Sequence, residues 1–186
     1  MKKYILTLLV ILTLCVMVCI TAPKADAATV ASGTCGANGG NLTWTLDDQG
    51  TLTISGTGAM KDWSYGSAPW YSKSSSIKKV TIGNSVTTIG NYAFSDCTGL
   101  KSVTIPDSVT TIGERAFFYC DGLKSVTIGN SVTTIGSSAF SDCTGLTGVY
   151  ISDIKVWCEI DFGNSYSNPL YYAKKLYLNN QLVTDL

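Results

Sequence analysis

Few residues in this chain have the chemistry to catalyse a reaction or hold a metal. Histidine is absent from all 186 residues, which excludes Ser-His-Asp and Cys-His nucleophiles and His-ligated metal sites. Glu159 and Asp161 are spaced to share one face of a strand beside aromatic residues, and a glycosidase needs two such carboxylates. Because one strand does not make a cleft, we predict a protein without catalytic residues and without enzyme activity.

The cysteines are the next candidates, because three of them recur at a fixed interval. Cys97, Cys120 and Cys143 are each separated by 23 residues. In stacked units their Cα atoms would be about 5 Å apart, but parallel side chains do not reach the dihedral angle of a disulfide. A linear row cannot surround a metal either. We therefore expect a buried thiol ladder, no metal and no cofactor, and no bond between the distant Cys35 and Cys158.

Side chains that could bind a partner gather where the 23-residue units differ from one another. Phe118 and Tyr119 stand where the other units have Ser-Asp. Exposed aromatic and arginine side chains are typical anchors of interfaces. The core positions are nearly constant among the three copies, whereas the outer positions vary. Such variation is expected of a binding surface, and it is equally expected where the identity of a surface residue matters little. The candidate binding residues are Phe118, Tyr119, Lys101, Lys124, Tyr92, Arg115 and Trp157.

A repeat must position these side chains. Residues 77–99, 100–122 and 123–145 align without gaps, and the first and third copies agree at 19 of 23 positions. Within one copy, Leu100, Val103 and Ile105 are strand-like, residues 106–108 form a turn, and Val109 to Ile112 is a second extended stretch. Ala116-Phe117 predicts one helical or 3₁₀ turn. One unit cannot bury its apolar face alone, so the units must stack.

The repeated residues resemble a known family. The pattern L-K-S-V-T-I-P-x-S-V-T-x-I-G-x-x-A-F-x-x-C is similar to the BspA-like class of leucine-rich repeats, which occur on bacterial and some protist surface proteins. The resemblance implies a repeat solenoid that is mainly β. A parallel sheet would lie on one side, with short strands and helical turns on the other. It also implies adhesion or protein binding at a cell surface without catalysis.

The two ends differ from the repeat. Residues 42–46 and 51–55 alternate apolar and polar residues around Asp47-Asp48-Gln49-Gly50, which predicts an N-terminal β-hairpin cap. The aromatic residues 63–71 that follow are expected to pack this cap, or to form a carbohydrate platform. At the other end, Leu176–Leu178 predicts a strand and Asn179-Asn180 a turn. No polar closing cap follows, so we expect a truncated stack or end-to-end self-association.

The N-terminal residues have the pattern of a targeting segment. Two lysines, an apolar run to Ile20 and Ala25-Asp26-Ala27 are typical of a secretory signal peptide cut after Ala27, although an uncleaved anchor is the alternative. The predicted segments are therefore a signal peptide at 1–27, a β-rich cap at 28–76, leucine-rich repeats at 77–151 and a divergent C-terminal repeat at 152–186.

Charge and composition narrow the class of partner. Only 14% of residues are charged and the formal net charge is zero, so nothing points to nucleic acid, and a membrane contact is expected only through the signal segment. We predict a secreted or cell-surface protein that binds a protein or glycan on a host or neighbouring cell. The alternative is a carbohydrate-binding module of a larger secreted protein, using Trp63, Trp70 or Trp157.

Overall fold

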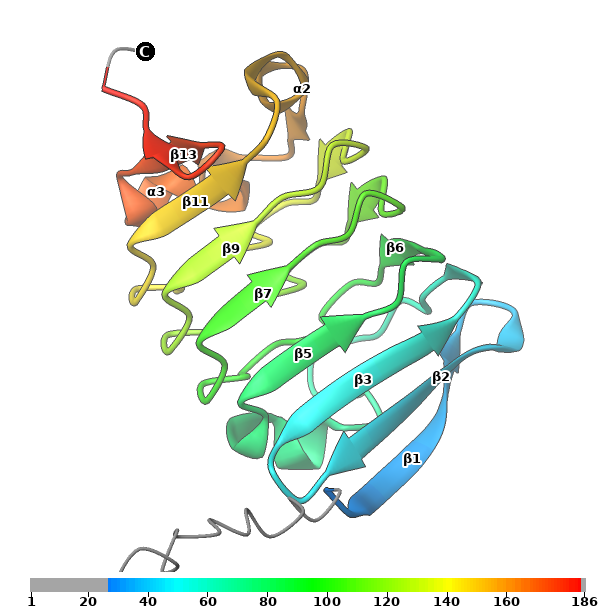
Figure 1. Cartoon of the computed structure of the whole chain (residues 1–186). Coiled ribbons are helices and arrows are strands. Elements are labelled where there is room, and N and C mark those ends of the chain that lie inside the picture. The colour runs from blue at the N-terminus through cyan, green and yellow to red at the C-terminus, as the bar shows by residue number, and fades with distance from the viewer. Residues whose placement is uncertain (1–26, 185–186) are drawn as a thin grey trace, which may run out of the picture.

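The fold is described for residues 27–184 of a computed structural model (Figure 1). The predicted signal peptide lies outside these residues except for Ala27, and so do residues 185–186. Within the described part of the chain, no helix is long and apolar enough to cross a membrane. The strands of this part form three sheets, one of four strands and two of five.

The N-terminal end is an antiparallel sheet. It consists of β1 (Thr29–Gly36), β2 (Gly39–Asp47) and β3 (Thr51–Gly56). The predicted hairpin is present as β2 and β3, with Leu46 opposite Leu52. The backbone amide of Thr51 donates to Asp47 Oδ1 at 2.7 Å, and this bond lowers the pKa of Asp47. Strand β3 then pairs in parallel with β5, so the cap continues directly into the repeats.

Each 23-residue unit adds strands to two parallel ladders. On one side lie β5 (Lys79–Ile82), β7 (Ser102–Thr104), β9 (Ser125–Thr127) and β11 (Gly148–Ile151). On the other lie β4 (Gly58–Ala59), β6 (Val86–Ile89), β8 (Thr111–Ile112), β10 (Thr134–Ile135) and β12 (Asp161–Phe162). Paired residues occupy the same position in successive repeats, since Val126 pairs with both Val103 and Val149. We expected one parallel sheet, and the second extended stretch forms another.

The remaining side of each unit is a run of turns, which corrects the prediction of a helical turn there. In residues 92–97 the amides alternate between two kinds of acceptor. Tyr92, Phe94 and Asp96 donate to carbonyls of the next unit, whereas Ala93, Ser95 and Cys97 donate three residues back. A helix would keep all of these bonds inside one segment. Every second amide donates to the next unit instead, so only the other half of the amides can form the bonds that a helix or 3₁₀ turn would have.

The core is a row of identical side chains. The rings of Phe94, Phe117 and Phe140 are buried and stack with centroids 5.2 Å apart at each step. The predicted thiol ladder is buried beside them, and the Sγ atoms of Cys120 and Cys143 donate to carbonyls 3.1 Å away. Burial raises the pKa of both thiols, which keeps them protonated and unreactive.

The C-terminal unit is longer and carries small helices. Its elements are α2 (Ile154–Cys158), η2 (Ser165–Ser167), α3 (Leu170–Ala173), β13 (Leu176–Leu178) and β14 (Gln181–Leu182). The predicted turn is present, because Asn179 and Asn180 have φ of 50° and 66° and join β13 to β14 in a hairpin. This φ pattern is that of a type I′ turn. The pair of tyrosines 150 and 177 stacks on the outer face of β11 and β13.

Candidate functional site

The turn side of the units places unusual side chains in a costly backbone conformation. Tyr92, Arg115 and Tyr119 have φ of 53°, 50° and 57°. The left-handed region costs a residue with a Cβ about 1–2 kcal/mol and favours glycine, asparagine and aspartate. The neighbouring units hold Asp96 and Asp142 where the second unit holds Tyr119. Bulky side chains at these positions therefore do not serve the backbone, and a different role must account for them.

These side chains meet in one cluster. The Tyr65 ring, which lies in the loop after β4, contacts three other rings at centroid distances of 5.7 to 6.2 Å, namely those of Tyr71, Tyr92 and Phe118. Tyr119 packs edge-on against Phe118 at 4.6 Å. Tyr65 is 53% exposed and Tyr119 49%. We call this set the aromatic patch: Tyr65, Tyr71, Tyr92, Arg115, Phe118 and Tyr119.

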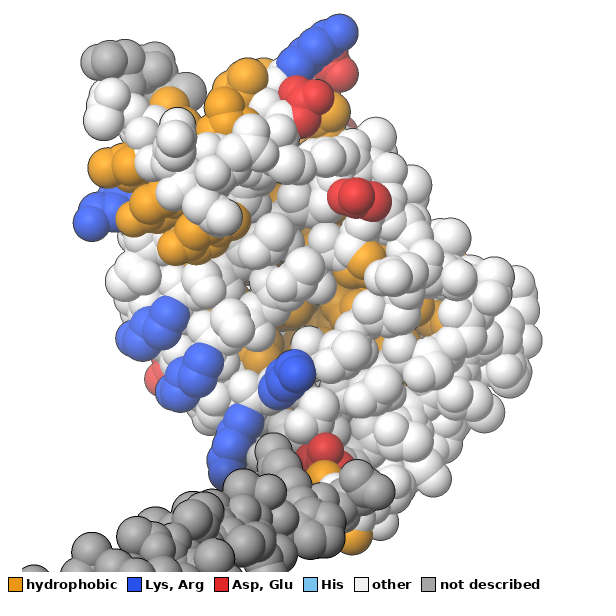
Figure 2. Space-filling model, in the orientation of Figure 1, with side chains coloured by type: hydrophobic (Ala, Val, Ile, Leu, Met, Phe, Trp, Pro, Cys, Tyr) orange, Lys and Arg blue, Asp and Glu red, His pale blue; other side chains and the backbone are white. Residues whose placement is uncertain are grey.

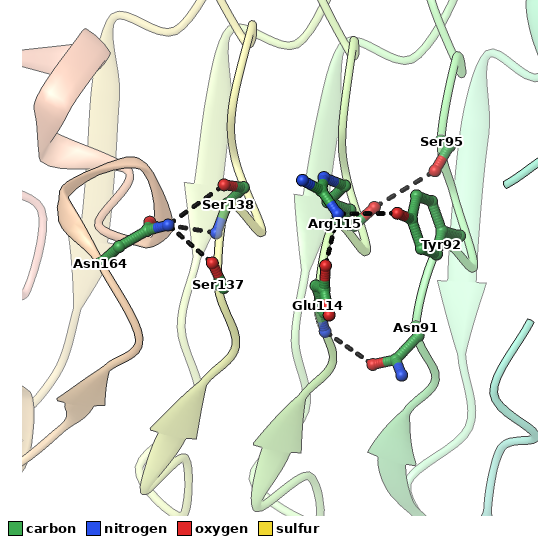
Figure 3. A network of polar contacts seen from close by, with 8 residues as sticks. All are labelled: Asn91, Tyr92, Ser95, Glu114, Arg115, Ser137, Ser138 and Asn164. Atoms are coloured by element: carbon green, nitrogen blue, oxygen red, sulfur yellow. Dashed lines mark hydrogen bonds and ion pairs between the residues drawn. The ribbon is translucent and has the colours of Figure 1, made fainter. Parts of the chain in front are cut away.

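A single cation lies inside the aromatic patch. The Arg115 guanidinium lies 5.7 Å from the centre of the Tyr92 ring and 5.9 Å from that of Phe118. One of its nitrogens donates to the Tyr92 hydroxyl at 2.8 Å and also pairs with Glu114 (Figure 3). The two side chains of this ion pair are 38% and 44% exposed to solvent, so the pair adds little stability. Its effect is to hold the guanidinium in a fixed position between two rings.

Neighbouring polar side chains align the turns that carry the patch. The Asn91 side chain accepts from the Glu114 amide at 2.7 Å, and Asn164 accepts in the same way from the Ser138 amide at 3.1 Å (Figure 3). At the edge of the patch the Tyr71 hydroxyl donates to Asp96 at 2.9 Å. The Tyr65 hydroxyl and the Asp96 carboxylate raise the pKa of Tyr71 well above its usual value, so Tyr71 stays neutral.

The structure separates the predicted binding residues into groups. Phe118, Tyr119, Tyr92 and Arg115 come together in the aromatic patch, as described above. Lys101 and Lys124 are exposed on another side, where β7 and β9 begin. Trp157 is only 7% exposed and packs edge-on against Phe162, so its indole belongs to the core.

The two carboxylates of the glycosidase hypothesis lie on the surface. Glu159 is the C-cap residue that follows α2, and Asp161 begins β12. Both are exposed, and the Glu159 carboxylate lies 3.9 Å from Lys155 Nζ. In residues 27–184 no three His, Cys, Asp or Glu side chains are grouped so as to hold a metal ion.

Two members of the aromatic patch were not among the sequence candidates. Tyr65 and Tyr71 were assigned to packing of the cap together with Trp63 and Trp70. Trp70 does so, because it is 1% exposed and its Nε1 donates to the Ala93 carbonyl at 2.7 Å. Tyr65 instead reaches along the stack to Phe118. It lies outside the 23-residue register, so no periodic signal could place it beside the repeats.

Comparison with known proteins identifies the family of this chain. A family model described as "BspA type Leucine rich repeat region" matches residues 67–174 with six copies, which is more than half of the chain. The chain belongs to this family. The BspA-type match confirms the resemblance inferred from the repeat, and it begins and ends outside the three regular copies, in the cap and in the divergent last unit. No curated protein sequence matches the chain.

Solved structures of leucine-rich repeat proteins are similar to this BspA-type chain. One from Eubacterium ventriosum is 25% identical with a TM-score of 0.53, and the match covers 81% of this chain and 45% of that one. A leucine-rich cell surface protein from Faecalibacterium prausnitzii is 21% identical over 67% of this chain and 41% of its own, with a TM-score of 0.47. A leucine-rich repeat protein from Bacteroides ovatus is 31% identical over 53% of this chain and 25% of its own, with a TM-score of 0.42. The chain spans less than half of each.

Proposed function

We propose that this chain is a non-catalytic repeat module, secreted or held at a cell surface, whose solenoid binds another protein through the aromatic patch. The observation that carries the proposal is the cluster of Tyr92, Phe118 and Tyr119 around Arg115. All of these residues except Phe118 are in left-handed backbone. Tyrosine and arginine are the residue types that dominate the binding energy of protein interfaces. Placing these bulky residues in left-handed backbone is unfavourable for folding. A role in binding would explain why they are present.

The contacts inside the patch also prepare it for binding. Tyr65, Phe118 and Tyr119 hold one another in place, and Tyr92 holds Arg115. Side chains that are fixed before binding lose less rotational freedom when a partner covers them, which improves affinity. Membership of the BspA-type family and the likeness to a leucine-rich repeat protein support a role in macromolecular binding.

The tryptophan-based carbohydrate alternative has less support. Trp70 and Trp157 are buried and Trp63 is half-buried, its ring edge-on to Trp70 at 5.3 Å. A sugar platform needs an exposed aromatic face, and none of these three indoles lies open on the surface. The exposed rings of the cap region and the second unit belong instead to the aromatic patch.

The chain itself supplies the matched variant that tests the aromatic patch. Phe118→Ser with Tyr119→Asn gives the second unit nearly the sequence of its neighbours, so the fold is retained. Asparagine replaces aspartate at 119 to avoid a third carboxylate in line with Asp96 and Asp142. We expect beads carrying this variant to retain at least about tenfold less of the wild-type chain's protein partners from a cell-surface extract, because hot-spot residues contribute about 2 kcal/mol or more each.

The control for this capture experiment is Lys61→Gln with Lys155→Gln, two exposed lysines outside the aromatic patch. Its retained proteins should match those of the wild type. Circular dichroism and thermal unfolding verify that each variant is folded. If the aromatic-patch variant retains the same proteins in the same amounts as the wild type, the proposed surface is wrong.

A further inference from the structure

The parallel ladder on the strand side is interrupted between the first and second units. Strand β5 ends one sheet (β1-β2-β3-β5) and β7 begins another (β14-β13-β11-β9-β7), although the two strands lie side by side (Figure 1). The residue after β5 is Gly83, whose amide donates to Ile54 of the preceding strand at 2.9 Å. The equivalent residue of the next unit is Pro106, which has no amide hydrogen to donate to β5. Pro106 therefore lies at the interruption and forms part of its wall.

The interruption leaves a groove in the face of the sheet. It has a volume of about 290 Å³ and is lined by Lys79, Val80, Thr81, Ile82, Asn84, Ser102, Thr104 and Pro106. The hydroxyl and amide side chains line the walls with hydrogen-bonding groups, while the valine, isoleucine and proline supply apolar surface. Figure 2 shows hydrophobic side chains at the bottom of this depression, surrounded by polar ones. We call it the sheet groove.

Basic side chains gather along one end of the same strands (Figure 2). Lys79 lines the sheet groove, and Lys101 and Lys124 precede β7 and β9. Adjacent backbones bring the last two together, because the Lys124 amide donates to the Lys101 carbonyl at 2.8 Å. All three are exposed, and the ion pairs found in residues 27–184 involve none of them. We call these three residues the lysine row.

We propose that the sheet groove and the lysine row together bind an anionic polysaccharide, one that carries carboxylate or sulfate groups. A sugar ring has an apolar face and a rim of hydroxyls, which match the apolar bottom and the hydroxyl-rich walls of the groove. Its acidic substituents would meet Lys79 and Lys101. Lys101 and Lys124 lie on adjacent backbones and repel each other, and a chain of anions removes that repulsion.

The composition of this face favours a polysaccharide over a single-stranded nucleic acid. Proteins that bind single strands stack the bases on aromatic side chains. The strands β5, β7 and β9 carry no aromatic residue. This face instead offers the hydroxyl groups of Thr81, Ser102 and Thr104 beside the charged lysines. Hydroxyl groups of this kind can form hydrogen bonds with the hydroxyls of a sugar. This site lies apart from the aromatic patch, so either site can be lost without the other.

Binding to defined polymers tests the proposal. The full chain, without its signal segment, is titrated with polygalacturonate, dextran sulfate, neutral dextran and a single-stranded oligothymidylate. We expect the two anionic glycans to bind, and neutral dextran to bind far more weakly. Lys79→Gln with Lys101→Gln should weaken binding at low salt by about tenfold or more and flatten its salt dependence, because fewer counterions are released. The matched control, Lys61→Gln with Lys155→Gln, removes the same charge elsewhere and should bind as the wild type does.

A second variant separates the groove from the charge. Pro106→Gly gives the second unit the glycine found at Gly83 and Gly129, and it removes the proline ring from the wall of the sheet groove while the lysines remain. We expect the loss of this apolar wall to weaken glycan binding by several-fold. Equal binding by wild type and both variants overturns the proposal, as does absence of binding to either anionic glycan. Oligothymidylate binding as tight as that of polygalacturonate overturns the polysaccharide assignment.

Discussion

A Phe117→Ala variant is expected to lose about 3–5 kcal/mol of unfolding free energy. The Phe117 ring is fully buried, and its two faces stack on Phe94 and Phe140 at 5.2 Å. Removing it leaves a cavity in the middle of the row and separates the ring contacts on either side. Because each unit is stabilised only by its neighbours, a defect in the second unit weakens the whole stack. Chemical denaturation measures the loss.

The adjacent residue provides the control for Phe117→Ala. Phe118→Ala makes the same substitution one position later, where the ring is half-exposed and points into the aromatic patch. We expect this variant to cost about 1 kcal/mol, because little buried area is lost. Equal losses for the two variants would contradict the assignment of Phe117 to the core and Phe118 to the surface.

Gly122→Ala is expected to destabilise the chain by about 3 kcal/mol. A Cβ at this position would lie 2.0 Å from the Thr98 carbonyl oxygen of the preceding unit. The obstructing atom belongs to the backbone rather than to the end of a flexible side chain, so a change of rotamer cannot relieve the clash. Gly145 has the same relation to Asp121, at 2.1 Å. Glycine at the end of each unit thus permits the close approach of successive units.

The matched glycine for comparison is Gly40, in β2, where an added Cβ would meet no atom within 4 Å. Its φ lies outside the left-handed region, so Gly40→Ala should leave stability unchanged or raise it by up to about 1 kcal/mol. Thermal unfolding of the two variants gives the comparison. A Gly122→Ala variant as stable as Gly40→Ala would show that the units are not packed as closely as described.

The repeat made the interior of this protein predictable. A period of 23 places each core residue beside its own copy, so the buried rows of Val103, Phe117 and Cys120 followed from the sequence. The hairpin of the cap and the Asn179-Asn180 turn followed from local turn chemistry. The first strand, β1, did not, because its residues 29–36 show no clear alternation before they pair with β2.

The surface was less predictable, because it depends on departures from the repeat. Tyr92 and Tyr119 are not left-handed residues by preference, so their backbone conformation is set by stacking and is invisible in the sequence. Pro106 lies in a turn, as predicted, but its place in the wall of the sheet groove depends on how the second unit lies beside the first. Tyr65 joins the aromatic patch from outside the repeat. Each of these features requires the relative position of two units.

The aromatic patch is proposed to serve binding rather than stability, and Tyr119→Asn separates these two roles in one pair of measurements. Asparagine relieves about 1–2 kcal/mol of left-handed strain, which offsets the roughly 0.5–1.5 kcal/mol of ring contact that is lost. The unfolding free energy should therefore stay within about 1 kcal/mol of the wild type, while retention of cell-surface protein on immobilised chain falls about tenfold. Unchanged retention, or a loss of stability as large as that of Phe117→Ala, would contradict the claim.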